Sequence, residues 1–358
     1  HLSMKYLVLF LISILNVSCN RNVKEKAFNG NSIAQEVKAY KYGAGDIVSK
    51  GYLDSKGNLW FTTSNEGVYK YNGKEFLNIM KDDGLCSDDV SSVIEDKNGK
   101  MWFATAKGLC KYDGSSFFNI PLPKNDSLLV SPKTGFPSRT TENVMNLIID
   151  KKANFWLGTD ASGAYKYDGT DFTPFLRFEG KLQPDSVYNN CITSILEDES
   201  GNIWFTSMTH GAITRFDGQT LTNFNVKDGL LGDMITSSFQ DSNGDIWFGS
   251  IQNLDGGISR WNGNNFTNFT VKDGLCDSNV TCFYQDESGK IWIGTGNGVC
   301  YYDGEKFTNF NNNGKSLGDI RLITKDREGN LWFGGRYGVL WQYDGKNISD
   351  FTYEKRRK

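Results

Sequence analysis

Histidine is almost absent from this chain of 358 residues, which contains only His1 and His210. With His1 at the first position, His210 is the one histidine left as a candidate general base or metal ligand. No Ser/His/Asp order, paired-histidine metal spacing or phosphate-cradling glycine loop stands out. We therefore expect no catalytic residues, no metal site and no cofactor, and a protein that is not an enzyme.

An excess of charge of one sign is also lacking. The chain has 39 Lys and Arg residues against 42 Asp and Glu residues, a net charge of −3. Nothing in this balance indicates a nucleic-acid partner. The concentrated charge at 354–358, which ends in Lys-Arg-Arg-Lys, is interpreted as a solvated basic tail.

Long hydrophobic runs are missing as well. The apolar run Tyr6–Leu15 has 10 residues and follows Lys5, and it is too short to span a bilayer comfortably. Ser18-Cys19 follows shortly after the run and resembles the lipobox of bacterial lipoproteins, although Asn16 stands where many such boxes have an aliphatic residue. An ordinary signal peptide with a chance cysteine is the alternative.

The lipobox resemblance implies that 1–19 is a signal peptide and that Cys19 is lipidated. The protein would then be exported and lipid-anchored to a bacterial membrane, on the periplasmic side or at the cell surface, because several acyl chains hold a protein firmly to a bilayer. Residues 20–45 are polar and charged, and we interpret them as a tether.

The rest of the chain is a tandem repeat marked by tryptophan. Seven tryptophans each follow a Leu, Met, Phe or Ile and recur every 40 to 54 residues. An aromatic residue followed by Asn-Gly or Asp-Gly comes after each of them. The seven are Trp60, Trp102, Trp156, Trp204, Trp247, Trp292 and Trp332.

Each repeat holds four short apolar runs, most clearly in 279–310. The runs are rich in β-branched and aromatic residues, and Gly or Asp marks the breaks between them. The predicted strands of this unit are Val280–Gln285, Ile291–Thr295, Val299–Tyr302 and Phe307–Phe310.

Four strands per repeat and a period of 40 to 50 residues are typical of a β-propeller. We predict an all-β fold, a seven-bladed β-propeller of four-stranded antiparallel blades over 46–353. A solenoid is the rival interpretation, but its repeats are usually shorter. Ile348–Phe351 completes the last blade alone, or Val37–Tyr42 pairs with that blade as well; the sequence leaves both open.

The second repeat resembles a known family. It carries Asp83-Gly-Leu, then Val90 to Asp96, then Gly99-Lys-Met-Trp-Phe-Ala-Thr, then Gly108-Leu-Cys-Lys-Tyr-Asp-Gly. This order is similar to the two-component regulator propeller repeat. In that family such propellers often form the periplasmic sensor of hybrid histidine kinases, commonly responding to glycans. We expect a stand-alone lipoprotein of this kind without a kinase.

Two pairs of cysteines occupy equivalent repeat positions. Cys86 and Cys276 follow Asp-Gly-Leu, whereas Cys110 and Cys300 lie 24 residues further on in each case. Two equivalent disulfides are conceivable in an exported protein. The alternative, which we favour, is that two repeats were copied with their buried thiols intact, so that all six cysteines after Cys19 are free thiols.

Departures from the repeat indicate where function lies. The segments 120–143 and 176–190 lengthen the loops that enter the third and fourth blades, and 249–257 lengthens a loop between a second and a third strand. Because the first strand of a blade starts at one face, both kinds of loop should share that face. Loops on a rigid scaffold often carry binding function. Tolerated surface drift is the alternative.

We predict a ligand over the mouth of the central channel on that face. The loops between second and third strands vary from blade to blade and offer polar groups that suit a polar ligand such as a glycan. Arg336 and Tyr337 are the leading pair, because they interrupt an otherwise regular loop. The other candidates are Asn65, Glu66, Lys107, Asp160, His210, Gln252, Asn253 and Asn297.

The predicted function is therefore non-enzymatic binding of a glycan, another polar ligand or a protein partner, by a monomer that reaches the membrane through its lipid anchor. One alternative is a propeller lyase similar to the streptogramin lyases, for which His210 is the catalytic candidate. The other is a purely structural scaffold. Asp241–Asp245 faintly resembles a calcium loop, but a turn accounts for it equally well, and no metal is predicted.

Overall fold

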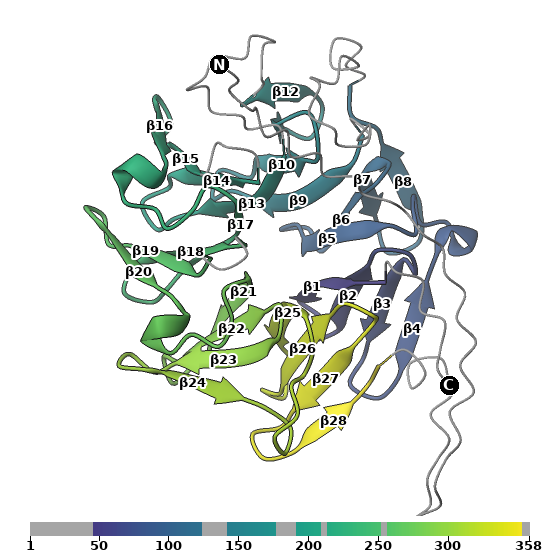
Figure 1. The fold of residues 1–358 in the computed structure, drawn as a ribbon. Helices are drawn as coiled ribbons and strands as arrows, with labels where there is room; N and C mark the ends of the chain where they lie inside the picture. Colours follow the sequence, from purple (N-terminus) through teal and green to yellow (C-terminus); the bar gives the residue numbers. More distant parts are fainter. Residues whose placement is uncertain (1–45, 124–141, 177–190, 209–212, 252–255, 353–358) are drawn as a thin grey trace, which may run out of the picture. The chain divides into compact units, whose positions relative to one another are not determined.

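The computed structural model describes residues 46–123, 142–176, 191–208, 213–251 and 256–352. They lie in one unit, Tyr42–Lys358, and form seven four-stranded antiparallel sheets arranged around a central axis (Figure 1). The predicted seven-bladed propeller is confirmed. In the sixth blade the third strand begins one residue earlier than expected, at Gly298, and the other three have the predicted bounds.

The strands of each blade follow one another in sequence and in space. The first, innermost strands are β1 (Val48–Leu53), β5 (Val90–Glu95), β9 (Val144–Ile149), β13 (Ile192–Glu197), β17 (Ile235–Gln240), β21 (Val280–Gln285) and β25 (Ile320–Lys325). The second strands are β2 (Leu59–Thr63), β6 (Met101–Thr105), β10 (Phe155–Thr159), β14 (Ile203–Ser207), β18 (Ile246–Ser250), β22 (Ile291–Thr295) and β26 (Leu331–Gly335). The third strands are β3 (Val68–Tyr71), β7 (Gly108–Tyr112), β11 (Ala164–Tyr167), β15 (Ile213–Phe216), β19 (Ile258–Trp261), β23 (Gly298–Tyr302) and β27 (Leu340–Tyr343). The outer strands are β4 (Phe76–Ile79), β8 (Phe117–Ile120), β12 (Phe172–Phe175), β16 (Leu221–Phe224), β20 (Phe266–Phe269), β24 (Phe307–Phe310) and β28 (Ile348–Asp350).

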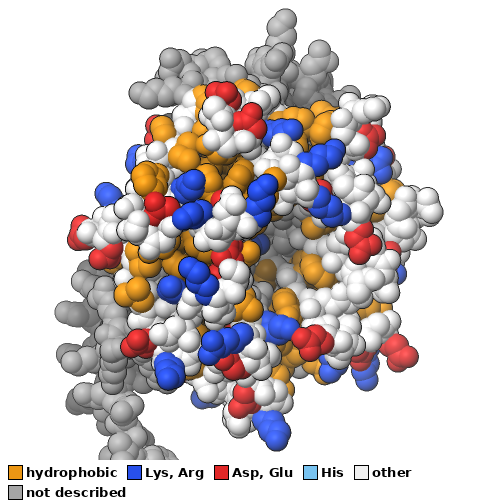
Figure 2. Space-filling model, turned by 180° about the vertical axis from the view of Figure 1, so that it is seen from behind, with side chains coloured by type: hydrophobic (Ala, Val, Ile, Leu, Met, Phe, Trp, Pro, Cys, Tyr) orange, Lys and Arg blue, Asp and Glu red, His pale blue; other side chains and the backbone are white. Residues whose placement is uncertain are grey.

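The first strands form the inner ring, since each contacts the first strands of both neighbouring blades. Figure 2 shows the molecule from the side opposite to Figure 1, with a hollow at its centre and Lys and Arg side chains spread around it. Every first strand carries a β-bulge at its second residue, where one residue of the strand has no partner on the second strand. A bulge turns its extra side chain away from the regular pleat.

A tryptophan and an aspartate hold each blade together. In blade one the indole Nε1 of Trp60 donates a hydrogen bond of 2.8 Å to Oδ2 of Asp54, while Oδ1 of Asp54 accepts the backbone N–H groups of the turn that follows. The same indole-to-carboxylate bond recurs in all seven blades at 2.8 to 2.9 Å. The tryptophans are at most 5% exposed, and burial of each contributes about 4–6 kcal/mol by area. They are core residues and not a sugar-stacking row.

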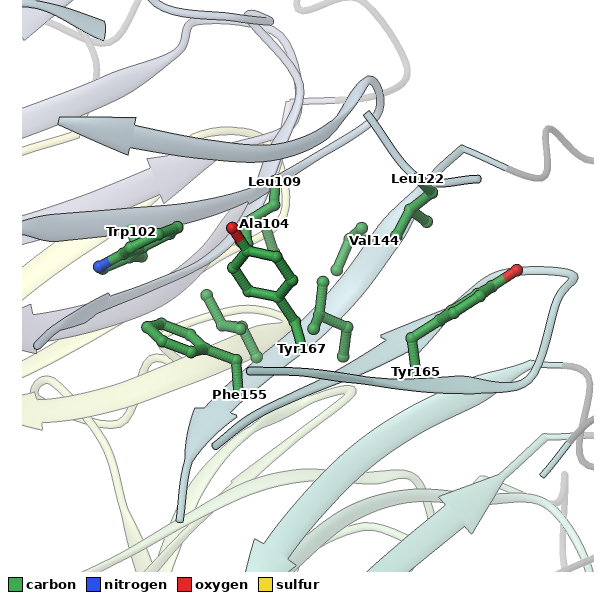
Figure 3. Close-up of a cluster of buried hydrophobic side chains, with 10 residues drawn as sticks. Trp102, Ala104, Leu109, Leu122, Val144, Phe155, Tyr165 and Tyr167 are labelled. Atoms are coloured by element: carbon green, nitrogen blue, oxygen red, sulfur yellow. The ribbon is translucent and has the colours of Figure 1, made fainter. Parts of the chain in front are cut away.

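The core is divided into seven clusters, one at each junction between neighbouring blades. Figure 3 shows the junction of blades two and three, where Trp102 lies against Phe155 with ring centroids 4.6 Å apart. The last junction joins Trp332 of blade seven to Phe61 of blade one, at 5.4 Å. Side-chain packing of the same kind as at the other junctions therefore closes the ring.

The last blade takes its fourth strand, β28, from its own repeat. Both interpretations of ring closure contain this strand, and they differ in whether 37–42 pairs with the same blade as well. The stretch 37–42, proposed as an additional strand, lies outside the described residues.

Candidate functional site

The loops between second and third strands share one face with the segments that enter the blades. In each blade the N–H that follows the second strand donates to the carbonyl that precedes the first strand, at 2.9 to 3.3 Å. Examples are Ser64 to Ile47 in blade one and Arg336 to Asp319 in blade seven. We call this side the insertion face, and the side with the Asp-x-x-Gly and aromatic-Asp-Gly turns the turn face. The topological argument from the sequence is confirmed.

The described candidates lie where the sequence placed them, in the loops between second and third strands of the insertion face. They are Asn65 and Glu66 after β2, Lys107 after β6, Asp160 after β10, Asn297 after β22, and Arg336 and Tyr337 after β26. His210, Gln252 and Asn253 lie outside the described residues, as do most of the three insertions.

Several of these side chains are fixed by the entering segments. The Asn65 amide donates to the Asp46 carboxylate at 3.0 Å, and Lys107 forms an exposed ion pair of 3.8 Å with Glu142. The Asp160 carboxylate accepts the thiol of Cys191 at 3.5 Å. Each of these contacts joins a candidate residue of a second-to-third strand loop to the segment that enters a blade. Together they stabilise the rim of the insertion face.

Glu66 forms its hydrogen bonds within its own blade. Its carboxylate accepts the phenol of Tyr69 at 2.6 Å, and its backbone N–H donates to Thr63 Oγ1. The side chain therefore supports its loop, and it is a weaker ligand-binding candidate than the sequence suggested.

Arg336 belongs to a three-residue charge cluster that the sequence reasoning missed in part. Its Nε lies 3.0 Å from Oδ2 of Asp319. The Asp319 carboxylate also accepts two hydrogen bonds from Arg321, at 2.6 and 2.8 Å. Paired Arg–carboxylate hydrogen bonds of this kind fix orientation as well as charge. Asp319 thus holds two guanidinium groups side by side.

Tyr337 is exposed and has an unfavourable backbone conformation. Its side chain is 55% exposed, and its φ is 61°. An L-residue in the left-handed region costs about 1–2 kcal/mol relative to the right-handed region, and strain of this kind occurs often at functional sites. The neighbouring Gly335 leaves no room for a Cβ against the Asp319 carbonyl. The loop therefore has little freedom and presents the Tyr337 ring to solvent.

Arg321 occupies the bulge position of its first strand, and its residue type is exceptional there. In blades four to six the bulge residue is a threonine whose hydroxyl donates to a carbonyl of the next first strand, as Thr193 does to Ile235 at 2.6 Å. The bulge residues in chain order are Ser49, Ser91, Met145, Thr193, Thr236, Thr281 and Arg321. Aligning the seven repeats on their tryptophans would have revealed the single arginine.

Lys50 is a second cation of the inner ring that the sequence reasoning missed. It follows the bulge of β1, and its positive charge favours the thiolate form of Cys282 on β21, two blades away. Water reaches its side chain, but the surrounding protein atoms lower the pKa of its ammonium group below the ordinary value. Desolvation without a paired carboxylate accounts for this direction.

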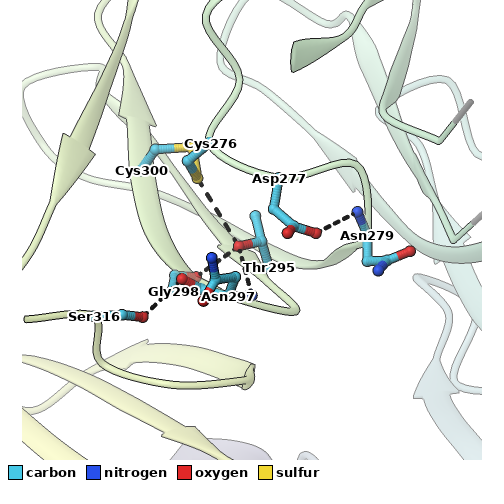
Figure 4. Close-up of a disulfide and its surroundings, with 8 residues drawn as sticks. All are labelled: Cys276, Asp277, Asn279, Thr295, Asn297, Gly298, Cys300 and Ser316. Atoms are coloured by element: carbon cyan, nitrogen blue, oxygen red, sulfur yellow. Dashed lines mark hydrogen bonds between the residues drawn. A yellow bond between two sulfur atoms is a disulfide. The ribbon is translucent and has the colours of Figure 1, made fainter. Parts of the chain in front are cut away.

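The structure contradicts the expectation of free thiols for four of the six cysteines. Cys86 is bonded to Cys110 and Cys276 to Cys300, with Cα atoms 5.9 and 6.0 Å apart, within the range that a disulfide needs. Equivalent repeat positions bring the entering segment against the third strand of the same blade, so each pair meets, as Figure 4 shows for Cys276 and Cys300. The two repeats therefore share an equivalent disulfide bond, and not only equivalent buried cysteines.

Other blades close the same contact with hydrogen bonds. In blade five Ser259 Oγ accepts the backbone N–H of Leu231 at 3.0 Å, and in blade seven the Trp341 indole donates to the carbonyl of Leu317 at 3.2 Å.

Cys282 differs from the paired cysteines: burial raises the pKa of its thiol to about 12, so it remains protonated at neutral pH. It is a poor nucleophile.

The described residues contain no group of three or more His, Cys, Asp or Glu side chains that could hold a metal ion. Asp241, considered above as part of a calcium loop, instead accepts two backbone N–H groups of its turn and the indole of Trp247. Within the same part of the chain, no helix has the length and apolar character needed to cross a membrane.

The repeat can now be compared with known proteins. The two component regulator propeller family model matches residues 84–107, 189–209, 229–252 and 274–297. Each match covers an entering segment and the first two strands of a blade. The chain carries the two-component regulator propeller repeat. Over 200 residues it is 28% identical to histidine kinase P4 of Formosa agariphila, a match that covers 52% of this chain and 14% of the kinase.

Solved structures share the propeller fold. The extracellular domain of a hybrid two component system from B. thetaiotaomicron has a TM-score of 0.64 at 23% identity, over 81% of this chain and 38% of that one. Virginiamycin B lyase from Staphylococcus aureus has a TM-score of 0.61 at 15% identity, over 82% of this chain and 94% of the lyase. At such identities this chain resembles both in fold alone.

Proposed function

We propose that this propeller is a non-enzymatic sensory or binding module that takes a polar ligand, such as a glycan, on its insertion face. The observation that carries the proposal is the loop after β26. It exposes the ring of Tyr337 in a strained backbone conformation beside Arg336, whose guanidinium Asp319 holds in place. An aromatic ring next to oriented hydrogen-bond donors can stack on a sugar ring and bind its hydroxyl groups.

The relatives support a sensory role over a purely structural one. The chain is similar to part of a histidine kinase, and the fold recurs in the extracellular domain of a two component system. The scaffold is uniform at its tryptophan–aspartate pairs, whereas the loops of the insertion face differ in every blade. A structural role alone gives no reason for this contrast.

A thermal-shift screen of glycans against the full chain tests the proposal, followed by affinity measurements on Arg336→Ala and Tyr337→Gly. Glycine tolerates a φ of 61°, so the Tyr337 variant removes the ring without adding strain. Arg327→Ala is the matched control, since Arg327 is an exposed arginine in the Asp-x-x-Gly turn of the same blade. We expect both loop variants to weaken binding and the control to retain it. Wild-type affinity in both loop variants would place the site elsewhere.

The proposal includes export and a lipid anchor at Cys19. Cys19→Ala should release the protein from membranes or leave the precursor unprocessed. Normal cleavage with unchanged membrane retention would contradict lipidation. The lyase alternative depends on His210, and catalysis that is lost in His210→Ala would favour it over simple binding.

A further inference from the structure

Three cationic side chains, Arg321, Arg336 and Lys50, lie on the insertion-face side of the two blades that close the ring. Arg321 and Arg336 share one carboxylate, that of Asp319. Among the described residues no other carboxylate lies within ion-pair distance of either guanidinium, and none lies within that distance of Lys50. Within ion-pair distance, these three cations therefore have one carboxylate among them in the described part of the chain, that of Asp319.

These cations belong to one region. Arg321 and Arg336 meet at Asp319, and Lys50 lies near the start of β1, which contacts β25, where Arg321 lies near the start. Lys50 comes from β1, Arg321 from β25 and Arg336 from the loop after β26. The last blade and the first therefore supply the cluster from both sides of the junction that closes the ring.

The arrangement opposes stability, which indicates a role in binding. The ammonium group of Lys50 has no carboxylate partner among the described residues, and the protein atoms around it lower its pKa, so the fold favours its charged form less than the unfolded chain does. Six of the seven blades have a small or neutral residue at the bulge where blade seven has Arg321. Neither cation is needed to build a blade, and such costs are typical of sites that are selected for function.

We propose that the insertion face binds saccharides that carry an acidic group, a carboxylate or a sulfate, with Arg321, Arg336 and Lys50 around the acidic group and Tyr337 against the sugar ring. The planar guanidinium groups match the oxygens of a carboxylate or sulfate in a way that a neutral hydroxyl does not. This inference rests on the proposed function and specifies its ligand class.

The test compares matched probes on the full chain by calorimetric titration: digalacturonate, 6-sulfated galactobiose and neutral galactobiose. We expect the carboxylated probe, the sulfated probe or both to bind at least about tenfold more tightly than galactobiose, with affinity falling as salt rises. The two acidic probes show which acidic group the site prefers.

Two variants locate the acidic group. Arg321→Thr installs the residue that the bulge has in blades four to six, and Lys50→Met keeps the length of the side chain without its charge. Each should reduce affinity for the acidic probe about tenfold or more while affinity for galactobiose stays unchanged. Lys50→Met should also raise the unfolding midpoint. If Lys50 instead stabilised the fold through an ion pair, the same substitution would lower the midpoint. Arg327→Ala again serves as the control.

The outcomes separate the two proposals. Equal affinity for acidic and neutral probes, lost in Arg336→Ala, would overturn the acidic-ligand inference and leave the binding site intact. Acidic-probe binding that none of the Lys50, Arg321, Arg336 and Tyr337 variants affects would overturn both. Failure of both acidic probes to bind at millimolar concentration would overturn this inference, while the glycan screen still tests the proposed function.

Discussion

At the scale of single residues, the aspartate that begins the turn between the first and second strands accepts the tryptophan indole in every blade. Burial raises the pKa of Asp150, but hydrogen bonds from Asn154, Trp156 and the backbone outweigh it, and the pKa is lowered overall. Asp54 and Asp286 behave in the same way. The charged carboxylate is the form that the blade requires.

This predicts a loss of stability in acid. A carboxyl with a depressed folded pKa stabilises the fold above its unfolded pKa near 3.8, and that stability is lost as the pH falls through the folded value. We expect the free energy of unfolding to decline below about pH 4, and Asp150→Asn to flatten the decline. Urea unfolding between pH 2 and 7 measures it. A wild-type curve parallel to that of Asp150→Asn would contradict the assignment.

At the scale of elements, the sequence predicted strands well and contacts between them less well. Alternation of residue types and Gly or Asp at the breaks are local signals, and they located the four strands of the sixth blade almost to the residue. The disulfides depend on where the entering segment meets the third strand, which local pattern does not encode. Arg321 and Lys50 were missed for a related reason, since the bulges that redirect the inner strands leave no mark within one repeat.

The disulfides should stabilise their blades. Each closes a loop with a sequence separation of 24 residues, for which the chain-entropy estimate is about 3 kcal/mol. Cys86→Ala combined with Cys110→Ala should lower the free energy of unfolding by about that amount. Urea unfolding with and without reductant checks it, and a variant that lacks both disulfides supplies the control because reductant should not affect it. A wild-type protein indifferent to reductant would show that the bonds are absent or do not stabilise the fold.

At the scale of the whole molecule, the ring is closed by packing between blades seven and one. Phe351 extends this junction, with its ring 5.0 Å from Trp332 and 5.9 Å from Phe76. All described strands lie between Val48 and Asp350. The described blades are therefore built from residues 48–350.

Removal of residues 1–41 should leave the unfolding midpoint unchanged, whereas Phe351→Ala should lower it because the large-to-small change opens the closing junction. Calorimetric scans of the two variants and the wild type measure this. A large drop on removal of residues 1–41 would mean that this segment contributes to the ring, as the second interpretation of ring closure proposed.

The central claim is that the insertion face, and not the turn face, binds the ligand. Hydrogen–deuterium exchange of the full chain, with and without a saturating acidic saccharide from the titrations above, tests it most directly. The account predicts slower exchange at residues 336–338 after β26 and at 296–298 after β22, with unchanged exchange at the Asp-x-x-Gly turns, including 326–329. Protection confined to the turns, with the loops of the insertion face unaffected, would contradict it.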